Sequence, residues 1–386
     1  MQIVSPLVKL KFIALFQSAP LLIHAPGRIN LIGEHTDYNE GFVMPAAIRM
    51  GLNFAFGVSD QSQSSIYSLK YHQLHVLDLS NPAKVETPVW VNYFLGIIDR
   101  LNTRGLKLDN FNCVFDGDLP TGAGLSSSAA MECGFVFGLN KLFNLGLTRL
   151  EMIYMAQWSE HNYAGVQCGI MDQFASMMGK ANHAFILDCR SLEYEYLPLE
   201  LGDYTLLLCD TNVKHTLASS EYNTRRNECQ QGVKLISKKY PIVKSLRDVT
   251  QPMLQVCKEM LPEQIYNRCR FVVEENNRVV EAAHDLKQGD LAAFGKKMFL
   301  AHEGLSALYQ VSCSELDFLV QFAKQETGVL GARMIGGGFG GCTLNIVHKN
   351  NSAPFLDSAK AAYHLKFGIE MSSYVVQPGA GTDVLI

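Results

Sequence analysis

Four side chains that could bind or activate a small polar molecule lie close together near the start of the chain. The segment GRINLIGEHTDYNEG, residues 27–41, contains Arg28, Glu34, His35 and Asp37 within ten positions. Two carboxylates, an imidazole and a guanidinium can donate hydrogen bonds to several hydroxyl groups and accept bonds from them at once. The segment therefore favours a binding site for a polyol or a sugar.

A solvated turn held by local ion pairs is the alternative for this first segment, because ion pairs on protein surfaces are common and weak. Ile29, Leu31 and Ile32 lie between the polar residues, which indicates that the segment packs against the rest of the protein. The backbone is expected to turn at its three glycines, Gly27, Gly33 and Gly41.

A second segment with chemical potential, LPTGAGLSSSAA at residues 119–130, precedes an apolar stretch that predicts a helix as far as Phe143. Gly122 and Gly124 permit close approach to the backbone. Free N–H groups and the positive end of the helix dipole make an anion site at such a junction, and a phosphate group fits it. The alternative is that the serines at 126–128 only cap the helix. A proline, two glycines and three hydroxyls exceed what a cap needs, which favours phosphate binding.

The third segment is GGGFGG, residues 336–341, which lies directly before an expected strand beginning at Cys342. Its five glycines in six positions do not fit strand propensity, because glycine weakens a strand and marks the close approach of a ligand or of another backbone segment. A tight bend or a β-bulge explains the segment equally well when it is taken alone.

A mixture of strands and helices must position these three loops. Short β-branched and aromatic runs predict strands at 21–24, 52–58, 65–69, 112–115, 183–187, 204–209 and 342–347. Helical periodicity predicts helices at 91–102, 125–143, 150–161, 170–178, 221–238, 272–286, 291–309, 316–325 and 355–367. Val8, Phe12 and Phe16 also recur at helical spacing, as in a small amphipathic helix that covers a core.

The composition describes an ordinary globular chain. Its 386 residues suggest two domains, or three, at about 150 residues per domain. The pattern becomes helix-rich after residue 204, so we expect the domain boundary near residue 200. The net charge of −4, with 18% charged residues, shows no basic excess of the kind that nucleic-acid binding requires.

Targeting and cofactor patterns are mostly absent from the sequence. The ten cysteines form no CxxC pair or Cys/His cluster, which is typical of reduced core thiols. No run of about 18 apolar residues could span a membrane, and the apolar run at 12–16 is too short for a secretion signal, so we expect a cytoplasmic protein. Neither a Rossmann GxGxxG set nor a Walker A loop occurs.

The three segments together resemble the signature motifs of the GHMP kinase superfamily, and the first is similar to the motif that marks the galactokinase family within it. Further similar stretches are WSEHNYAG at 158–165, CGIMDQF at 168–174, DCRSL at 188–192, SSEYNTRR at 219–226 and RMIGGGFGGC at 333–342. The resemblance runs from about residue 24 to residue 345. It implies a mixed α/β fold with a ribosomal-S5-like domain at 1–200, a ferredoxin-like domain at 201–386, and an active site in the cleft between them.

The same resemblance implies roles for individual residues. Asp172 would be the catalytic base, with Arg28 beside it to stabilise charge on the reacting groups. Mg²⁺ would be held by Ser128 and Glu160. Galactose would contact Glu34, His35, Thr36, Asp37, Gly169 and Tyr222. The phosphates of ATP would be wrapped by Gly122, Ala123, Gly124, Leu125, Ser126, Ser127 and Ser128.

Each of three implied roles has an alternative when the residue is taken alone. Asp172 could be an acid favoured by the dipole at a helix start. Glu160 could be an exposed carboxylate late in a helix, and Tyr222 could be a partly buried aromatic. One departure also stands out, because Ser306 and Ala307 replace an Arg-Asp pair that galactokinases commonly have. These two residues could line the nucleotide or the sugar side of the cleft.

The activity that the resemblance implies is ATP-dependent phosphorylation of the C1 hydroxyl of α-D-galactose, the first step of the Leloir pathway of galactose metabolism. Phosphoryl transfer needs an anion cradle, a metal, an acceptor held in line and in some cases a base, and the sequence offers a candidate for each. Two alternatives remain: a kinase for a related sugar such as N-acetylgalactosamine, and a galactokinase-like regulator that senses sugar. The expected partners are ATP, Mg²⁺ and galactose, and the expected state is a monomer.

Overall fold

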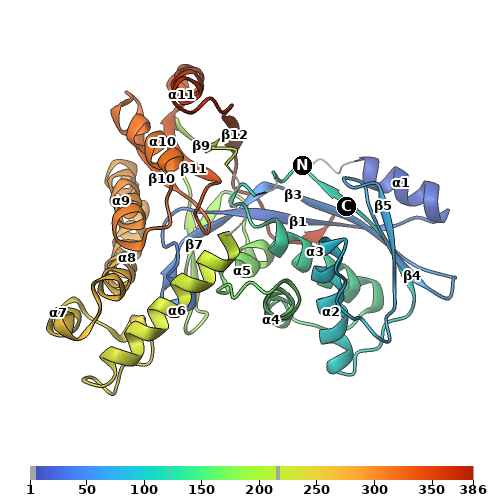
Figure 1. Ribbon diagram of the computed structural model, residues 1–386. Helices are drawn as coiled ribbons and strands as arrows, with labels where there is room; N and C mark the ends of the chain where they lie inside the picture. Colours follow the sequence, from blue (N-terminus) through green and yellow to red (C-terminus); the bar gives the residue numbers. More distant parts are fainter. Residues whose placement is uncertain (1–5, 121, 214–217, 386) are drawn as a thin grey trace.

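The largest sheet of the described chain has six strands. The computed structural model describes residues 6–120, 122–213 and 218–385. The sheet has the order β13-β1-β3-β6-β4-β5, and its pairs are antiparallel except for β4 with β6. Figure 1 shows its two longest strands, β1 and β3, running across the molecule. The strands are β1 (Leu21–Asn30), β3 (Pro45–Val58), β4 (Ser64–Ser68), β5 (Gln73–Leu77), β6 (Phe111–Gly117) and β13 (Asp383–Val384).

Helices cover both faces of this sheet. Successive side chains of a strand point to opposite sides, so one strand packs against helices on both faces. Phe54 and Phe56 of β3 face the helices α2 (Asn92–Thr103) and α3 (Ser127–Phe143) in the main core. Ala55, between them, packs against Val8 and Phe12 of α1 (Pro6–Phe16) on the other face. The expected amphipathic helix near the N-terminus is therefore confirmed.

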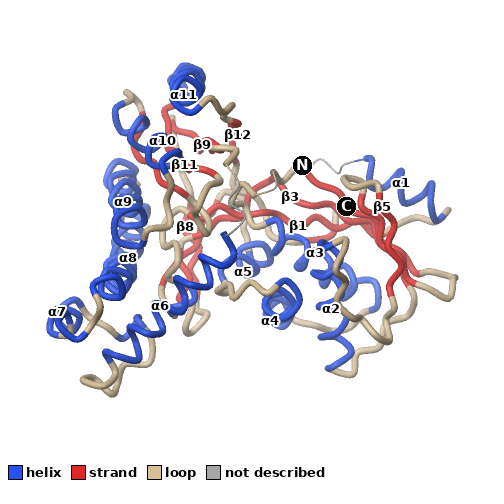
Figure 2. Tube along the Cα trace, viewed as in Figure 1, coloured by secondary structure: helices blue, strands red, loops and turns tan. Residues whose placement is uncertain are grey.

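Two more helices extend the layer on the α3 side of the sheet, as the tube in Figure 2 shows. They are α4 (Arg149–Ser159) and α5 (Met171–Met178), and α4 runs directly into a π-helical segment, Glu160–Ala164. A second, smaller antiparallel sheet has the order β2-β7-β8. Its strands are β2 (Phe42–Val43), β7 (His183–Asp188) and β8 (Tyr194–Pro198).

The C-terminal part contains an antiparallel sheet of order β10-β11-β9-β12, covered by helices. Leu207 and Cys209 of β9 pack with α10 and α11, whereas Leu206 and Leu208 join the main core. The strands are β9 (Tyr204–Asp210), β10 (Val329–Met334), β11 (Cys342–His348) and β12 (Ser372–Val376). The helices are α6 (Ala218–Ile236), α7 (Gln251–Val256), α8 (Glu263–Lys287), α9 (Leu291–Gly304), α10 (Ser314–Gln325) and α11 (Ser352–Phe367), with a π-helical segment at Leu305–Tyr309.

The chain crosses back to the first sheet after β12. Val384 of β13 pairs with Ile23 of β1, and the N–H of Gly379 donates to the carbonyl of Ala47 at 2.8 Å. The boundary near residue 200 stays a prediction, and the return of residues 379–385 ties the two halves of the chain together.

Every strand and helix predicted from the sequence is present, with shifted ends. The helix predicted from 272 begins at Glu263, and the helix predicted from 125 begins at Ser127. Sequence patterns did not predict the strands β2, β5, β8, β10, β12 and β13 or the short helix α7. Among residues 6–120, 122–213 and 218–385, no helix is both long and apolar enough to cross a bilayer.

Gly27 does not turn the chain, contrary to expectation. It lies inside β1, where the pairing with β3 shifts register between Pro26 and Arg28. A Cβ at this position would lie 2.6 Å from the Leu119 side chain and 2.7 Å from the Leu125 carbonyl oxygen. Gly27 therefore allows the start of the second segment to lie against β1. Gly33, with φ of +98°, does redirect the backbone as expected.

Candidate functional site

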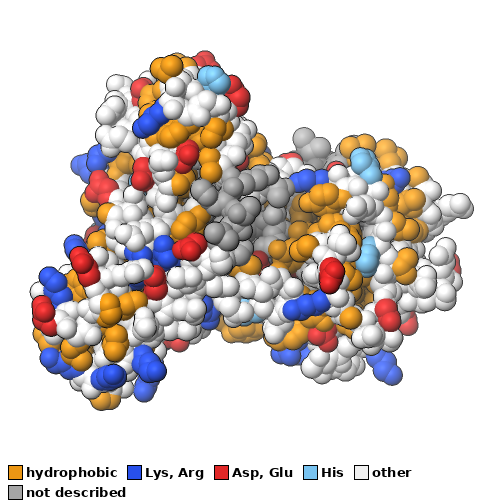
Figure 3. Space-filling model, in the orientation of Figure 1, with side chains coloured by type: hydrophobic (Ala, Val, Ile, Leu, Met, Phe, Trp, Pro, Cys, Tyr) orange, Lys and Arg blue, Asp and Glu red, His pale blue; other side chains and the backbone are white. Residues whose placement is uncertain are grey.

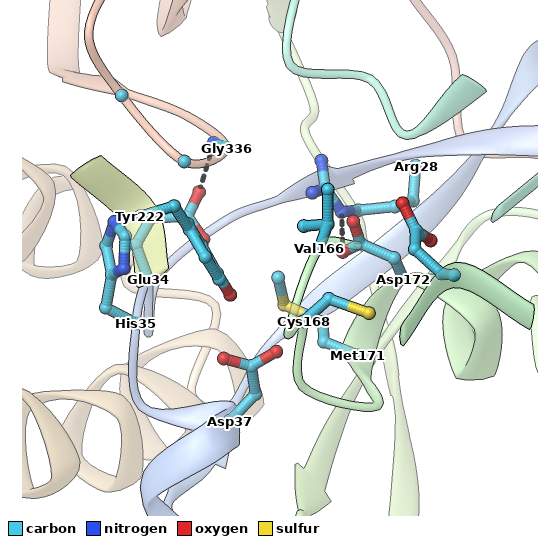
Figure 4. Close-up of a pocket in the computed structure, with 13 residues that line it drawn as sticks. Arg28, Glu34, His35, Asp37, Val166, Cys168, Met171, Asp172, Tyr222 and Gly336 are labelled. Carbon is cyan, nitrogen blue, oxygen red and sulfur yellow. Dashed lines mark hydrogen bonds and ion pairs between the residues drawn. The ribbon is translucent and has the colours of Figure 1, made fainter. Parts of the chain in front are cut away.

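The first and third segments meet in one cavity of about 240 Å³. Figure 4 shows side chains from both halves of the chain pointing into it. Arg28 comes from β1, Asp172 from the start of α5, and Tyr222 from α6. The residues that line the cavity are Arg28, Glu34, His35, Asp37, Glu160, Val166, Cys168, Met171, Asp172, Tyr222, Gly336, Gly337 and Gly338.

Arg28 and Asp172 form a close ion pair at this cavity. The Arg28 Nε lies 2.7 Å from Asp172 Oδ1, and the Arg28 Nη1 donates to the carbonyl of Gly124 at 2.5 Å. Burial alone would lower the pKa of the Arg28 guanidinium, but the charges of Asp172 and Glu34 outweigh it and raise that pKa. Asp172 does stand near a helix start, as the alternative required, but its carboxylate also faces a buried permanent cation.

Ser126 holds the same carboxylate from the other side. Its Oγ donates to Asp172 Oδ2 at 2.6 Å, and it caps no backbone group of α3. Its φ of +58° is in the left-handed region, which is strained for a residue with a side chain. The simple capping alternative for this serine is therefore wrong, because its side chain is directed to the cavity.

Glu34 is a buried carboxylate that joins the first segment to the third. Its Oε1 accepts from the N–H of Gly336 at 2.8 Å, and its Oε2 accepts from Asn30 Nδ2 at 2.5 Å. Arg333, which is fully buried, places its Nη2 3.5 Å from Glu34 Oε1. Burial raises the pKa of Glu34, although the charges of Arg333 and Arg28 act in the opposite direction. No pattern in the sequence indicated that Asn30 and Arg333 would hold Glu34.

Asp37 and Tyr222 point into the same space in Figure 4. Burial, with the charge of Asp172, raises the pKa of Asp37 to about 7. The backbone of Gly169 lies against the carboxylate of Asp37, because a Cβ at Gly169 would stand 2.0 Å from Asp37 Oδ2. Thr36 is also placed beside the cavity rather than in its wall, and its hydroxyl bonds the carbonyls of Gly33 and Phe42 at 2.8 and 2.6 Å.

Glu160 is buried, so the reading of it as an exposed carboxylate is wrong. Gln173 Nε2 donates to Glu160 Oε2 at 2.8 Å, and Ser128 makes a further hydrogen bond to this carboxylate. Burial raises the pKa of Glu160 to about 7, against the effect of the Ser128 bond. Glu132, which the sequence reading missed, is fully buried beside Gln173.

The predicted metal pair, Ser128 and Glu160, is thus brought together. Within the described parts of the chain, no group of three or more His, Cys, Asp and Glu side chains has the arrangement of a metal site. One hydroxyl and one carboxylate are nevertheless the hard oxygen ligands that Mg²⁺ takes beside phosphates.

The second segment runs along the third at backbone contact. Gly122 and Gly124 have φ of +82° and +75°, and a Cβ on Gly124 would lie 2.9 Å from the carbonyl oxygen of Ile335. Gly336, with φ of +78°, faces Gly124 in turn, because a Cβ on Gly336 would lie 3.0 Å from the Gly124 Cα. Thr121, inside the predicted loop, lies outside the described residues. All three glycine-bearing segments therefore converge at one place.

A second cavity, of about 210 Å³, adjoins the first turn of α3 and was not predicted. Ser127 and Ser128 form part of its wall, and rings of Tyr71, Trp90 and Tyr93 form another part. The indole Nε1 of Trp90 is buried without a hydrogen-bond partner. An aromatic cavity with a free donor beside an anion cradle can hold a flat heteroaromatic group.

Ser306 and Ala307 line neither cavity. They stand with His302 and Asp317 in a groove between α9 and α10, where Ser306 Oγ donates to Asp317 Oδ2 at 2.9 Å. The departure from the common Arg-Asp pair therefore lies outside the walls of both cavities.

Three family models match the chain. They are the GHMP kinases N terminal domain at residues 92–180, the galactokinase galactose-binding signature at 10–58 and the GHMP kinases C terminal model at 282–365. Among curated proteins, the galactokinase of Thermotoga neapolitana is 40% identical over 94% of this chain and 99% of its own length. The galactokinase of Clostridium acetobutylicum is 40% identical over 92% of each chain.

Solved structures agree with these matches. The crystal structure of Lactococcus lactis galactokinase complexed with galactose has a TM-score of 0.95 and 36% identity, covering 99% of this chain and 100% of that one. A mevalonate kinase with 18% identity and a TM-score of 0.65, covering 92% of this chain and 99% of its own, shares the fold. The mixed α/β fold with N- and C-terminal GHMP parts is thus confirmed.

Proposed function

The chain belongs to the galactokinase family of the GHMP kinases, and from this premise we propose that it transfers the γ-phosphate of ATP to the C1 hydroxyl of α-D-galactose. The observation that carries the proposal is the Arg28–Asp172 pair, with N and O atoms 2.7 Å apart, at the wall of a polar cavity. The same pair touches the second segment through Gly124 and Ser126. A hydroxyl held in the cavity would therefore meet a phosphate held by that segment.

Galactose would lie in the cavity of about 240 Å³, which is smaller than the ~300–1,000 Å³ typical for drug-sized ligands. Glu34 and Asp37 offer oxygens to the hydroxyls of the sugar, while His35 and Tyr222 offer groups that donate or accept. Gly169 would act through Asp37, because the Asp37 carboxylate lies against the backbone of Gly169. Thr36 would keep the turn of the first segment in shape.

Asp172 would take the proton of the C1 hydroxyl as the oxygen attacks the γ-phosphorus and the bond to ADP breaks. Its Oδ1 is paired with Arg28 and its Oδ2 accepts from Ser126, so the carboxylate has a fixed orientation. Holding the acceptor in line and placing permanent positive charge beside the moving phosphoryl group supply most of the catalysis expected for such a transfer.

ATP would place its phosphates on the segment from Gly122 to Ser128, which leads into the N-terminal end of α3 and borders the second cavity at Ser127 and Ser128. The adenine base would enter the second cavity, between the aromatic side chains and the unpaired Nε1 of Trp90. Ser128 lines that cavity and also bonds Glu160, which lines the first. The two ligands would thus meet near Ser128.

Ser128 and Glu160 would hold Mg²⁺, which when bound supplies positive charge to the β- and γ-phosphates. Their fit to the ion rests on the donor set and on burial. A carboxylate whose pKa is raised to about 7 by burial gains most from a neighbouring cation.

We also propose that the protein is a cytoplasmic monomer of two domains divided near residue 200, on the basis of the near-neutral charge and the reduced cysteines of the chain.

The test is galactose-dependent release of ADP from MgATP by the purified protein, compared between the parent and Asp172→Asn. Loss of a general base typically costs ~10²–10⁴ in rate, so we expect kcat of the variant to fall by at least ~10². Asp285→Asn is a matched control, because Asp285 pairs with Lys297 at 2.6 Å outside both cavities. The proposal is wrong if the parent releases no ADP with galactose, or if N-acetylgalactosamine is preferred to galactose. Binding of both ligands without turnover would indicate a regulator.

A further inference from the structure

A chain of buried hydrogen bonds leads away from His35 into the C-terminal half of the protein. His35 Nδ1 lies 2.7 Å from Tyr38 Oη, and Tyr38 Oη lies 2.7 Å from Tyr309 Oη. Tyr309 Oη in turn lies 3.1 Å from the Sγ of Cys229. Tyr309 and Cys229 are fully buried or nearly so, and neither Tyr38 nor Tyr309 lines the sugar cavity.

His35 itself is held in an unusual position. Its side chain is 97% buried, and its φ of +63° is in the left-handed region, which costs energy for a residue with a side chain. Its Nδ1 is engaged by Tyr38, and its Nε2 is buried. His35 lines the cavity together with Gly337, whose backbone adjoins the imidazole.

Aromatic rings confine the imidazole on several sides. Its centroid lies 4.9 Å from the ring of Tyr309 and 5.3 Å from that of Tyr222, beside which Figure 4 shows it. Phe271 packs on the far side of Tyr309 at 4.8 Å. Between these aromatic rings, the hydroxyls of Tyr38 and Tyr309 and the thiol of Cys229 form the hydrogen-bond chain that starts at Nδ1 of His35.

We propose that Tyr38 and Tyr309 are positioning residues for sugar recognition, which fix the imidazole of His35 in the tautomer that carries hydrogen on Nε2 and hold the ring in place in the wall of the sugar cavity. The naming of the ligand as a sugar rests on the proposed function. The positioning of the imidazole does not depend on it. Neither tyrosine touches the sugar, so each acts through His35.

The direction of the chain follows from the chemistry of its members. An aromatic hydroxyl is a good donor, and an unprotonated imidazole nitrogen is a good acceptor, so in the proposed tautomer Tyr38 donates to Nδ1. Tyr38 then accepts from Tyr309, and Tyr309 accepts from the Cys229 thiol. Burial lowers the pKa of His35 to about 3, so the ring is neutral, and a neutral ring that accepts a hydrogen bond at Nδ1 has its hydrogen on Nε2.

Calorimetry of galactose binding without ATP tests the role in recognition. We expect Tyr38→Phe and Tyr309→Phe each to weaken galactose binding roughly tenfold while the affinity for MgATP is kept, since each removes one link of the chain and no bulk. In a His35→Ala background, Tyr38→Phe should have no further effect. Tyr363→Phe is the control, because it removes a buried hydroxyl that bonds the Thr211 carbonyl at 2.8 Å far from the cavity.

Parent-like galactose affinity in both tyrosine variants would overturn the proposal. A loss as large in the His35→Ala background as in the parent would also overturn it, because the tyrosines would then not act through His35. Melting temperatures of all variants show whether a weakened affinity reflects partial unfolding.

Nitrogen NMR of ¹⁵N-histidine-labelled protein without sugar tests the positioning separately. We expect the His35 signals of the parent to report a single neutral tautomer with hydrogen on Nε2, and those of Tyr38→Phe to report a mixture. Hydrogen on Nδ1 in the parent, or an unchanged spectrum in Tyr38→Phe, would contradict the proposal. If the parent does not bind galactose, the proposed function fails, and this spectrum still decides whether the chain fixes the ring.

Discussion

At the scale of single residues, the guanidinium of Arg28 joins three parts of the site. It pairs with Asp172, bonds the carbonyl of Gly124 and lends charge to Glu34. A planar group with several fixed donors can make these contacts at once, and a lysine ammonium cannot reproduce them.

Arg28→Lys should therefore lower kcat by ~10², or about 2.7 kcal/mol of transition-state stabilisation. Steady-state rates with galactose and MgATP measure the effect. Arg270→Lys is the matched control, since Arg270 pairs with Glu274 at 2.7 Å on an exposed helix face. Retention of more than half of kcat in Arg28→Lys would show that charge alone is sufficient at this position.

Asp37 makes galactose binding depend on pH. Its pKa of about 7 lies in the range of ordinary buffers, and the ionised form accepts more hydrogen bonds than the acid. Galactose should bind about tenfold more tightly at pH 8 than at pH 6, as calorimetry would measure. His35 stays neutral in this range because its pKa is about 3. Asp37→Asn should remove the trend, and an equal trend in that variant would assign it to another group.

The same shift acts on folding with the opposite sign. The pKa of Asp37 is raised from 3.8 to about 7, so between these values the folded chain holds a proton that the unfolded chain has released. The contribution of Asp37 to stability therefore falls as pH rises from about 4 to about 7 in the absence of ligand. Urea unfolding of the parent and of Asp37→Asn at several pH values checks the sign.

At the scale of elements, α3 lies very close to the sheet. A Cβ on Gly138 would lie 2.1 Å from the Phe56 ring, and one on Gly134 would lie 2.3 Å from the Phe54 ring. Glycine at these positions lets the start of α3 lie beside β1 and the ion pair of Arg28, so the packing of this helix also sets the geometry of the site.

Gly138→Ala should lower the free energy of unfolding by ~1–3 kcal/mol through overpacking, although alanine is the better helix former by about 1 kcal/mol. Chemical denaturation measures the change. Adding Phe56→Leu should restore part of the loss, because it frees the space that the methyl group needs. A stability equal to that of the parent would show that the ring moves aside without cost.

Elements with a clear apolar period were predictable, and those that lack one were missed. The exposed hairpin strand β5, QLHVL, has a single buried residue, and β8, YEYLP, is exposed along most of its length. In β10, VLGARM, a glycine and an arginine hide the strand pattern, although Arg333 is fully buried. The first turns of α8, EQIYNRCR, are polar, so the prediction began nine residues late.

The glycine-bearing segments of the site could be recognised in the sequence, whereas the residues that hold them could not. Arg333 donates to the carbonyl of Asn30 across 303 positions of the chain, and Gln173 bonds Glu160 at the point where α4 passes into a π-helical segment. Such contacts exist only once the sheets are assembled, and no spacing rule in the sequence encodes them.

At the scale of the whole molecule, the two halves meet at backbone contact where Gly336 faces Gly124. The N–H of Gly336 also binds Glu34, so a shift of this loop reaches both the sugar side and the phosphate side. The charge of the protein surface, by contrast, does not join the two halves at the site. On the face drawn in Figure 3, the described residues show both signs interspersed, in agreement with a net charge of −4.

Gly336→Ala should weaken galactose binding and raise KM for ATP together, each by about tenfold or more, because a methyl group there lies 3.0 Å from the Gly124 Cα. Calorimetry and steady-state kinetics measure the two effects. Gly368→Ala is the matched control: its φ of +68° carries a similar backbone penalty, and nothing lies within 4 Å of the added Cβ. If both variants lose the same affinity, the effect comes from stability rather than from the contact.

The return of β13 to β1 has a consequence for how the protein is made. Ribosomes deliver a chain from its N-terminus, and domains generally fold as they emerge. Here the edge of β1 at Ile23 stays unpaired until Val384 has been made, because β13 is the last strand of the described chain to be synthesised. An exposed strand edge is a template for wrong pairing. The first sheet is therefore completed only after Val384 has been synthesised, and until then the edge of β1 stays open to wrong pairing.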